Sequence, residues 1–159
     1  MYAGTYTILM VEDDPVDIQL AMRIMKEKVP ALRVILAHSG SEALQMIYPD
    51  GDSPDPALLQ NLNAILLDLH MPGIDGFEVL QRLKSRAETR SFPVVVLTSS
   101  REIKDIERSY KLGANSYVVK PIGMEDFERV VGEIVTYWLK TNETPATHIP
   151  VHFPQKRSA

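Results

Sequence analysis

Short runs of apolar residues recur along the chain, and a segment with helical spacing follows each run. The run Ala64–Leu67 (AILL) is continuous apolar sequence, which is typical of a parallel strand covered on both faces. Strands are predicted over Thr7–Val11, Arg33–Ala37, Ala64–Leu67, 94–97 and Ser116–Val119. Helices are predicted from Pro15 onward and over 41–48, 77–84, 103–112 and 125–139. Because crossovers between parallel strands are right-handed, these elements favour an α/β fold, a five-stranded parallel sheet with helices on both faces.

The composition limits the class of protein. The chain has 159 residues, of which 45% are hydrophobic and 24% charged, as expected of one globular domain with a substantial core. Cys is absent, which excludes disulfides and thiolate metal sites. A net charge of −4 argues against nucleic acid as the main partner. No apolar stretch approaches the ~20 residues of a membrane span and no signal-peptide pattern is present, so we expect a cytoplasmic protein.

Polar side chains stand where the predicted strands end. Glu12 and Asp13 follow the first strand, Asp68 the third, Thr98 the fourth and Lys120 the fifth. Because the carboxyl ends of parallel strands meet at one edge of a sheet, we expect these side chains to lie close together. Crowded carboxylates repel one another, and Mg²⁺ neutralises such a site while leaving room for phosphate oxygens. With a lysine and a hydroxyl to bind phosphoryl oxygens, Asp68 is predicted to be a nucleophile that becomes an aspartyl phosphate.

A set of residues in fixed order carries a family resemblance. The set consists of Glu12-Asp13, Asp68, Thr98-Ser99, Lys120-Pro121 and, three residues before the lysine, Tyr117. In this order they resemble the receiver domain of two-component response regulators, and the resemblance spans roughly residues 6–140. It implies a flavodoxin-like fold in which five parallel strands are covered by five helices.

The resemblance also implies a phosphorylation site that depends on a metal ion. A histidine kinase would phosphorylate Asp68, and the chain itself would promote only its own phosphorylation and dephosphorylation. Mg²⁺, for which Mn²⁺ or Ca²⁺ can substitute, would be bound by Asp13, Asp68, the backbone carbonyl of His70 and, directly or through water, Glu12. His70 and Ser100 would flank the route by which water attacks the acyl phosphate.

Three further residues have implied roles in binding phosphate and transmitting the signal. Thr98 would bind a phosphoryl oxygen, and Lys120 would form an ion pair with the phosphate. Tyr117 would change rotamer as Thr98 moves, carrying the signal to the surface formed by the last two helices and the fifth strand. The resemblance implies a cis bond between Lys120 and Pro121, and an X–Pro bond adopts cis at little cost.

Two other classes of protein fit the residues less well. A haloacid-dehalogenase-type phosphatase also has a nucleophilic Asp after a buried strand, but it needs a second Asp where this chain has His70. A flavodoxin-type flavin carrier needs a phosphate-binding loop after the first strand, and here that loop is Glu12-Asp13-Asp14, which would repel phosphate.

The predicted domain organisation is a receiver over residues 1–140 and a tail over 141–159, with no output domain. Such a protein would signal through protein–protein contact alone. The proline-containing insertion at 49–56 and the last helix ending VTYWLK resemble stand-alone receivers associated with phytochrome-type histidine kinases in light signalling. A generic phosphorelay intermediate, or a regulator of an unrelated histidine kinase, stays open as an alternative.

The last predicted helix carries more apolar residues than one sheet face needs. Trp138 lies on the main apolar stripe, and Val135, Tyr137 and Leu139 widen that stripe on both sides. We therefore expect a homodimer in which the ends of two such helices pack together as an isologous pair. Cover by neighbouring helices or by the tail is the alternative.

Overall fold

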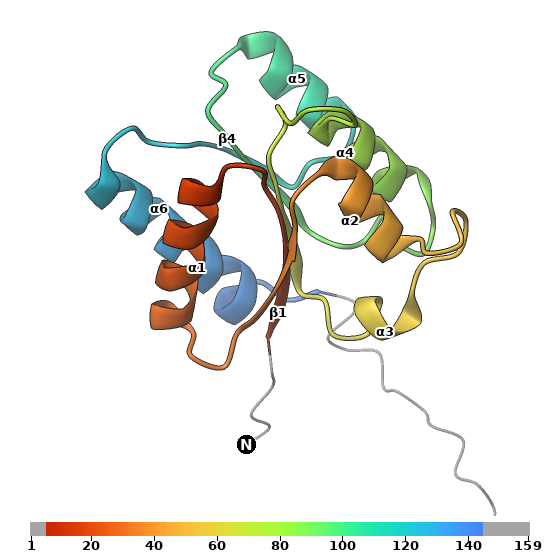
Figure 1. Ribbon diagram of the computed structural model, residues 1–159, viewed down its shortest axis with the longest axis horizontal. Coiled ribbons are helices and arrows are strands. Elements are labelled where there is room, and N and C mark those ends of the chain that lie inside the picture. Colours follow the sequence, from red (N-terminus) through yellow and green to blue (C-terminus); the bar gives the residue numbers. More distant parts are fainter. Residues whose placement is uncertain (1–5, 145–159) are drawn as a thin grey trace, which may run out of the picture.

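The computed structural model describes residues 6–144 and contains a five-stranded parallel sheet (Figure 1). The strands are β1 (Thr7–Val11), β2 (Arg33–Ala37), β3 (Ala64–Leu67), β4 (Val94–Thr98) and β5 (Ser116–Val119). Their order across the sheet is β2-β1-β3-β4-β5. The helices are α1 (Pro15–Lys28), α2 (Gly40–Ile47), α3 (Pro56–Leu59), α4 (Gly76–Ser85), α5 (Ile103–Lys111) and α6 (Met124–Thr136), followed by the π-helix η1 (Tyr137–Thr141).

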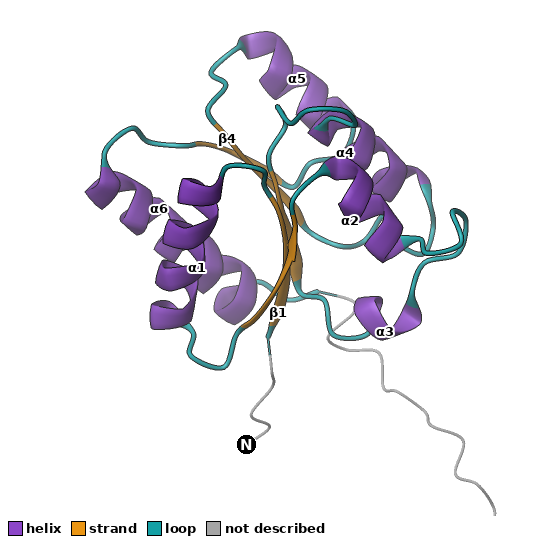
Figure 2. Cartoon of the chain, viewed as in Figure 1, coloured by secondary structure: helices purple, strands orange, loops and turns teal. Residues whose placement is uncertain are grey.

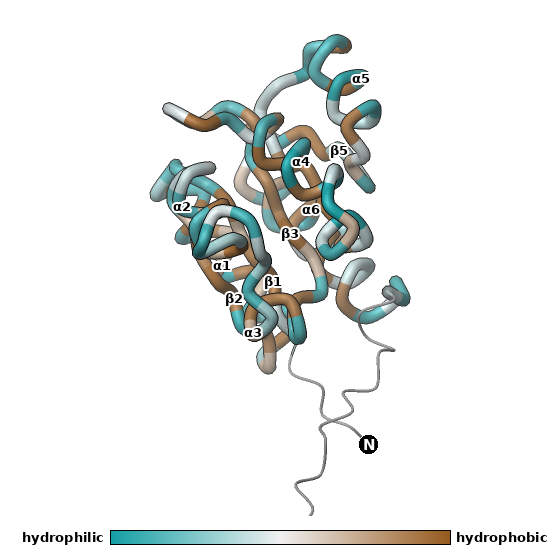
Figure 3. The backbone as a smooth tube through the Cα atoms, turned by 90° about the vertical axis from the view of Figure 1, so that its right-hand side faces the viewer, coloured by the Kyte–Doolittle hydropathy of each residue, from teal (hydrophilic) through white to brown (hydrophobic). Residues whose placement is uncertain are grey.

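The sheet lies between two layers of helices (Figure 2). Helices α1 and α6 cover one face, and α2, α4 and α5 lie on the other. Successive residues of β3 alternate between the two cores: Ile65 and Leu67 pack under α2 and α4, whereas Ala64 and Leu66 pack under α1 and α6. Figure 3 shows hydrophobic strands between helices with hydrophilic segments. Because both sides of the strand are buried, its sequence is apolar throughout.

Local hydrogen bonds fix where the first two helices begin. The carboxylate of Asp14 accepts from the amides of Val16 and Asp17 at 2.8 and 3.0 Å, so Asp14 caps α1. In α2 the hydroxyl of Ser39 accepts from the amide of Glu42 at 3.0 Å, and the Glu42 carboxylate accepts from the amide of His38 at 2.7 Å. This arrangement resembles a capping box, but Glu42 accepts from the amide of His38 rather than from that of the N-cap Ser39.

Two local predictions are corrected. No helix is predicted for the proline-containing segment 49–56, but its end begins the short helix α3, where the Asp55 carboxylate accepts from the Ala57 amide at 2.9 Å. Residues 6–144 contain no cis peptide bond, so the Lys120–Pro121 bond is trans rather than cis. The two isomers of an X–Pro bond differ by only about 0.5–1 kcal/mol, so the dipeptide alone does not determine the isomer.

The end of the last helix corrects part of the dimer prediction. Val135 is fully buried and Leu139 is 6% exposed, and both belong to the core shared with α1. They are unavailable to a second copy because α6 is covered on two sides, by the sheet and by α1. Tyr137 is 51% exposed and Trp138 is half-buried.

Two further expectations concern the tail and the membrane. Of the predicted tail, residues 141–144 are described and begin with the last residue of η1, whereas 145–159 lie outside the described residues. Among the helices of the described part of the chain, none has the length and apolar content needed to cross a bilayer.

Candidate functional site

The register of the sheet brings the strand ends together at one edge, which we term the carboxyl edge. The amide of Asp68 donates to the carbonyl of Val11 at 3.0 Å, which places Asp68 beside Glu12. The amide of Lys120 donates to the carbonyl of Thr98 at 2.8 Å, so these two residues are also neighbours. In Figure 1 this edge lies where β1 leads into α1.

Three carboxylates form a group at the carboxyl edge, which we term the acidic cluster: Glu12, Asp13 and Asp68. One oxygen atom from each of these side chains lies within 4.8 Å of the other two. Glu12 is 3% exposed and Asp68 7% exposed, whereas Asp13 is exposed to solvent. A set of hard oxygen ligands at this spacing suits a divalent cation, which would also neutralise the buried charge.

Glu12 already has partners for both of its oxygens. Oε1 accepts from the amides of Asp13 and Asp14, each at 3.1 Å, and Oε2 lies 2.6 Å from Nζ of Lys120. Because its oxygens are already hydrogen-bonded, Glu12 is suited to bind a cation through a water molecule. Asp13 and Asp68 are the better candidates for direct contact with a cation. The carbonyl of His70 as a further ligand stays a prediction.

Lys120 is surrounded by carboxylates. Its Nζ lies 2.6 Å from Glu12, 2.8 Å from Asp17 and 3.7 Å from Asp68, and its side chain is 10% exposed. Burial favours the neutral amine, but the hydrogen bonds to Asp17 and Glu12 outweigh it, so the pKa of Lys120 is raised. The sequence analysis missed Asp17. The available signal was its position in the first turn of α1, three residues after the cap Asp14.

Burial raises the pKa of Glu12 to about 7, and the negative charge of Asp68 adds to the rise while Lys120 opposes it. The pKa in the folded state thus lies above the value of 4.5 that an ordinary glutamate has. Stability that depends on this proton is fully present below pH 4.5 and is lost as the pH rises through about 7.

We predict that the metal-free protein loses stability relative to Glu12→Gln as the pH rises from about 5 to about 8. The pKa shift corresponds to at most about 3 kcal/mol. Urea unfolding in the presence of a chelator measures the difference between the two proteins at each pH. Glu88→Gln, at an exposed glutamate, is the control and should follow the wild type. Parallel pH profiles for wild type and Glu12→Gln would contradict this prediction.

The hydroxyls of Thr98 and Tyr117 approach the same loop, which follows β4. Thr98 is fully buried, and its Oγ1 accepts from the amide of Ser100 at 3.5 Å. The hydroxyl of Tyr117 donates to the carbonyl of Ser100 at 3.0 Å. The neighbouring Ser99 is exposed, and Pro121 is half-buried beside Lys120. The structure therefore places both predicted switch residues next to one loop at the carboxyl edge.

His70 has a side-chain partner that the sequence analysis missed. Its Nε2 lies 2.9 Å from Oδ2 of Asp105 in α5, and the hydroxyl of Ser100 donates to the same oxygen at 2.7 Å. The sequence signal was weak, since Asp105 reads only as an acid in the first turn of a helix.

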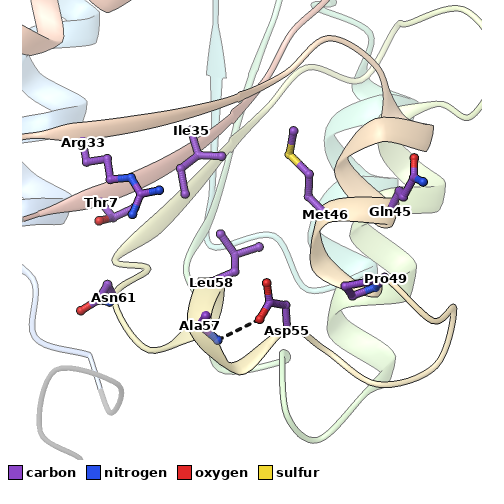
Figure 4. A pocket seen from close by; sticks show the side chains of 10 residues that line it. All are labelled: Thr7, Arg33, Ile35, Gln45, Met46, Pro49, Asp55, Ala57, Leu58 and Asn61. Carbon is purple, nitrogen blue, oxygen red and sulfur yellow. Dashed lines mark hydrogen bonds between the residues drawn. The ribbon is translucent and has the colours of Figure 1, made fainter.

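One hollow of the described residues lies away from the carboxyl edge. It has a volume of about 470 Å³ and lies between β2, α2 and α3, at the end of the sheet where the strands begin (Figure 4). Thr7, Arg33 and Leu58 are among the residues that line it, and the Asp55 carboxylate beside it already accepts from a backbone amide. It shares no residue with the acidic cluster, so this hollow is not part of the candidate site.

Comparison with known proteins agrees with this geometry. The model of the response regulator receiver domain matches residues 8–131. A probable methanogenesis regulatory protein, FilR2 of Methanothrix harundinacea, is 37% identical over 142 residues, which is 88% of this chain and 88% of FilR2. The response regulator Rcp1 of Synechocystis sp. is 35% identical over 142 residues, covering 87% of this chain and 92% of Rcp1.

Solved structures show the same architecture. The phosphorylated cyanobacterial phytochrome response regulator RcpA matches with a TM-score of 0.77 and 32% identity, over 88% of this chain and 98% of RcpA. The Mn²⁺-bound form of Rcp1 matches with a TM-score of 0.76 and 32% identity, over 88% of this chain and 99% of Rcp1. The predicted flavodoxin-like receiver fold is confirmed, and a metal-bound relative together with the acidic cluster supports divalent-metal binding. This chain belongs to the response regulator receiver domain family.

Proposed function

We propose that this chain is a response regulator that accepts a phosphoryl group on Asp68 from a histidine kinase in a Mg²⁺-dependent reaction. The observation that carries the proposal is the acidic cluster: one oxygen from each carboxylate lies within 4.8 Å of the others, and Nζ of Lys120 lies 3.7 Å from Asp68. Asp68, at the end of a buried strand, thus lies beside two further carboxylates that can bind a cation and beside the positive charge of Lys120.

The chemistry is a transfer between two nucleophiles. An oxygen of Asp68 attacks the phosphorus of a phosphohistidine, a P–O bond forms as the P–N bond breaks, and the electron pair returns to the imidazole nitrogen. When bound, Mg²⁺ would neutralise the carboxylates and bind phosphoryl oxygens. Lys120 supplies positive charge to one phosphoryl oxygen and Thr98 supplies a hydroxyl donor, in the way that preorganised donors stabilise developing charge.

Exposed apolar side chains follow β1 and β5 at the carboxyl edge and support a protein partner there. Val16, at the start of α1, is 69% exposed; Ile122, two residues after Lys120, is 100% exposed; and Met124 is 64% exposed. Val16 and Met124 also line a common hollow between α1 and α6. An apolar surface beside a phosphorylation site suits a kinase domain that must bring its phosphohistidine to Asp68.

The proposed partner class is a phytochrome-type histidine kinase, and the output is protein–protein contact. The support is the similarity to RcpA, which is described as a phytochrome response regulator. The test is transfer of labelled phosphoryl from an autophosphorylated phytochrome-type kinase to the wild type and to Asp68→Asn, with an unrelated histidine kinase as the comparison. Fast transfer to the wild type from the phytochrome-type kinase alone supports the proposal. Equal transfer from both kinases favours a generic phosphorelay role.

A second copy of the chain is the other proposed partner, through the exposed part of the last helix. Tyr137 and Trp138 form an edge-to-face ring pair 5.0 Å apart at 89°, and Tyr137 is half exposed. We predict that Tyr137→Glu dimerises more weakly than the wild type. In an isologous contact the introduced carboxylate faces the same carboxylate of the second copy, and the two repel each other. Sedimentation with and without a small phosphodonor measures this, and Gln81→Glu on exposed α4 surface is the control. A wild type that stays monomeric at high micromolar concentration in both states would refute the dimer.

A further inference from the structure

A buried carboxylate outside the acidic cluster has an unusual position. Asp105 lies in the first turn of α5, where the helix dipole stabilises an acidic side chain even when it is exposed. Asp105 is nevertheless buried, with 7% of its surface exposed. Its Oδ2 accepts from the hydroxyl of Ser100 at 2.7 Å, and this hydrogen bond lowers the pKa of Asp105. Since a carboxylate only accepts hydrogen bonds, Nε2 of His70, 2.9 Å away, is the donor in the second hydrogen bond.

The two groups bound by Asp105 come from the loops that follow two neighbouring strands, β3 and β4, at the carboxyl edge. His70 follows Asp68 by two residues at the end of β3, and Ser100 follows Thr98 by two residues at the end of the neighbouring strand β4. Asp105 is itself fixed in α5, since the hydroxyl of Ser109 donates to its carbonyl at 2.8 Å. One carboxylate oxygen thus ties the loop that contains Asp68 to the loop that follows Thr98.

The loop after β4 has further ties, so the positions of these groups are well defined. The hydroxyl of Tyr117 donates to the carbonyl of Ser100 at 3.0 Å, and the amide of Glu102 donates to the Ser100 hydroxyl at 3.3 Å. The ring of His70 packs edge-on to Phe77, with centroids 6.3 Å apart. The side chain of His70 is nevertheless 55% exposed. Among the hydrogen bonds of the described residues, its one side-chain contact is the bond to Asp105.

We propose that Asp105 is a positioning residue for the phosphorylated state: it ties His70 and Ser100 together across the mouth of the site and thereby slows hydrolysis of the acyl phosphate. This inference rests on the proposed function of Asp68. In the hydrolysis, water forms a bond to phosphorus as the bond between phosphorus and Asp68 breaks. The electron pair stays on the Asp68 carboxylate, inorganic phosphate leaves, and one proton is released to solvent. A tied pair of side chains leaves water less access to the phosphorus than two independent ones.

The experiment compares dephosphorylation rates of the full chain after loading with phosphoramidate and Mg²⁺ and removal of the donor. Asp105→Ala removes both hydrogen bonds, and we expect its acyl phosphate to hydrolyse about fivefold faster than that of the wild type. A change of about fivefold corresponds to the net stabilisation of about one hydrogen bond. Asp105→Asn retains an oxygen acceptor and should hydrolyse within about twofold of the wild type. Glu102→Ala is the matched control, because it removes an exposed acid from the same end of α5.

A double-mutant cycle separates positioning from a merely structural role. If Asp105 acts through His70, then His70→Ala and Asp105→Ala each accelerate hydrolysis and the double variant is no faster than either one. Additive rates, a wild-type or slower rate for Asp105→Ala, or failure of Asp105→Asn to restore the rate would each overturn this inference while leaving phosphorylation of Asp68 intact. A wild type that takes up no phosphoryl group would instead overturn the proposed function, and this inference with it.

Discussion

Lys120→Met should lower the free energy of unfolding of the metal-free protein by about 3–5 kcal/mol at pH 8. The Lys120 side chain is 10% exposed, and it is the cation that contacts both Glu12 and Asp68, whose side chains are 4% and 8% exposed. Removing the ammonium leaves two buried carboxylates with like charge and no counter-ion. Removing one partner of a buried ion pair destabilises a protein more than replacing both partners by apolar residues. Asp17 loses the same partner but is 30% exposed, so water can solvate much of its charge.

Two conditions should reduce this loss of stability. At pH 6 Glu12 is mostly protonated because its pKa is about 7, so less unpaired charge remains in the variant. Mg²⁺ should stabilise Lys120→Met more than it stabilises the wild type, since a cation at the acidic cluster would replace the missing charge. Urea unfolding with chelator or with Mg²⁺ measures both effects, and Lys104→Met, at an exposed lysine, is the control. Equal stability of Lys120→Met and wild type at pH 8 would show that Lys120 does not neutralise the cluster.

The sheet and the acidic cluster could be predicted from the sequence because both depend on short-range patterns. Apolar runs such as Ala64–Leu67 identify buried strands, and parallel strands necessarily bring their carboxyl ends to one edge. It was therefore enough to note that Glu12, Asp68 and Lys120 each follow a strand. The order of the strands and the exact distances were not needed for that conclusion.

The partners of Lys120 and His70 could not be predicted in the same way. The contact between Lys120 and Asp17 joins residues 103 positions apart, and it depends on which way a long side chain turns once α1 has packed against the sheet. The contact between His70 and Asp105 likewise depends on the first turn of α5 facing inward rather than toward water. Such rotamer and packing choices are made by tertiary structure, and they leave no periodic signal in the sequence.

The last helix shows a different limit of pattern analysis. A uniform rotation of ~100° per residue applies to α6 but not to η1, in which the amide of Asn142 donates to the carbonyl of Tyr137 at 2.7 Å. Leu139 lies in η1 and packs into the core shared with α1 instead of widening an outer stripe. Only Tyr137 keeps a large exposed apolar surface in this region.

Phosphoryl acceptance should be abolished by Asp68→Asn, the largest functional effect that we expect. Asn has nearly the shape of Asp, and its amide lacks the nucleophilic carboxylate oxygen that forms the acyl phosphate. The rest of the site stays in place: Lys120, the other members of the acidic cluster and the buried hydroxyl of Thr98. Loss of phosphorylation in this variant would therefore identify the acceptor atom rather than a general failure of the site.

The most direct measurement is the intact mass of the wild type and of Asp68→Asn after incubation with phosphoramidate, in Mg²⁺ or in chelator. We predict that the wild type gains the mass of one phosphoryl group in Mg²⁺ and little or none in chelator, and that Asp68→Asn gains none in either condition. Equal modification of the wild type and Asp68→Asn would contradict the assignment of Asp68 as the phosphoacceptor, and so would a wild type that is never modified.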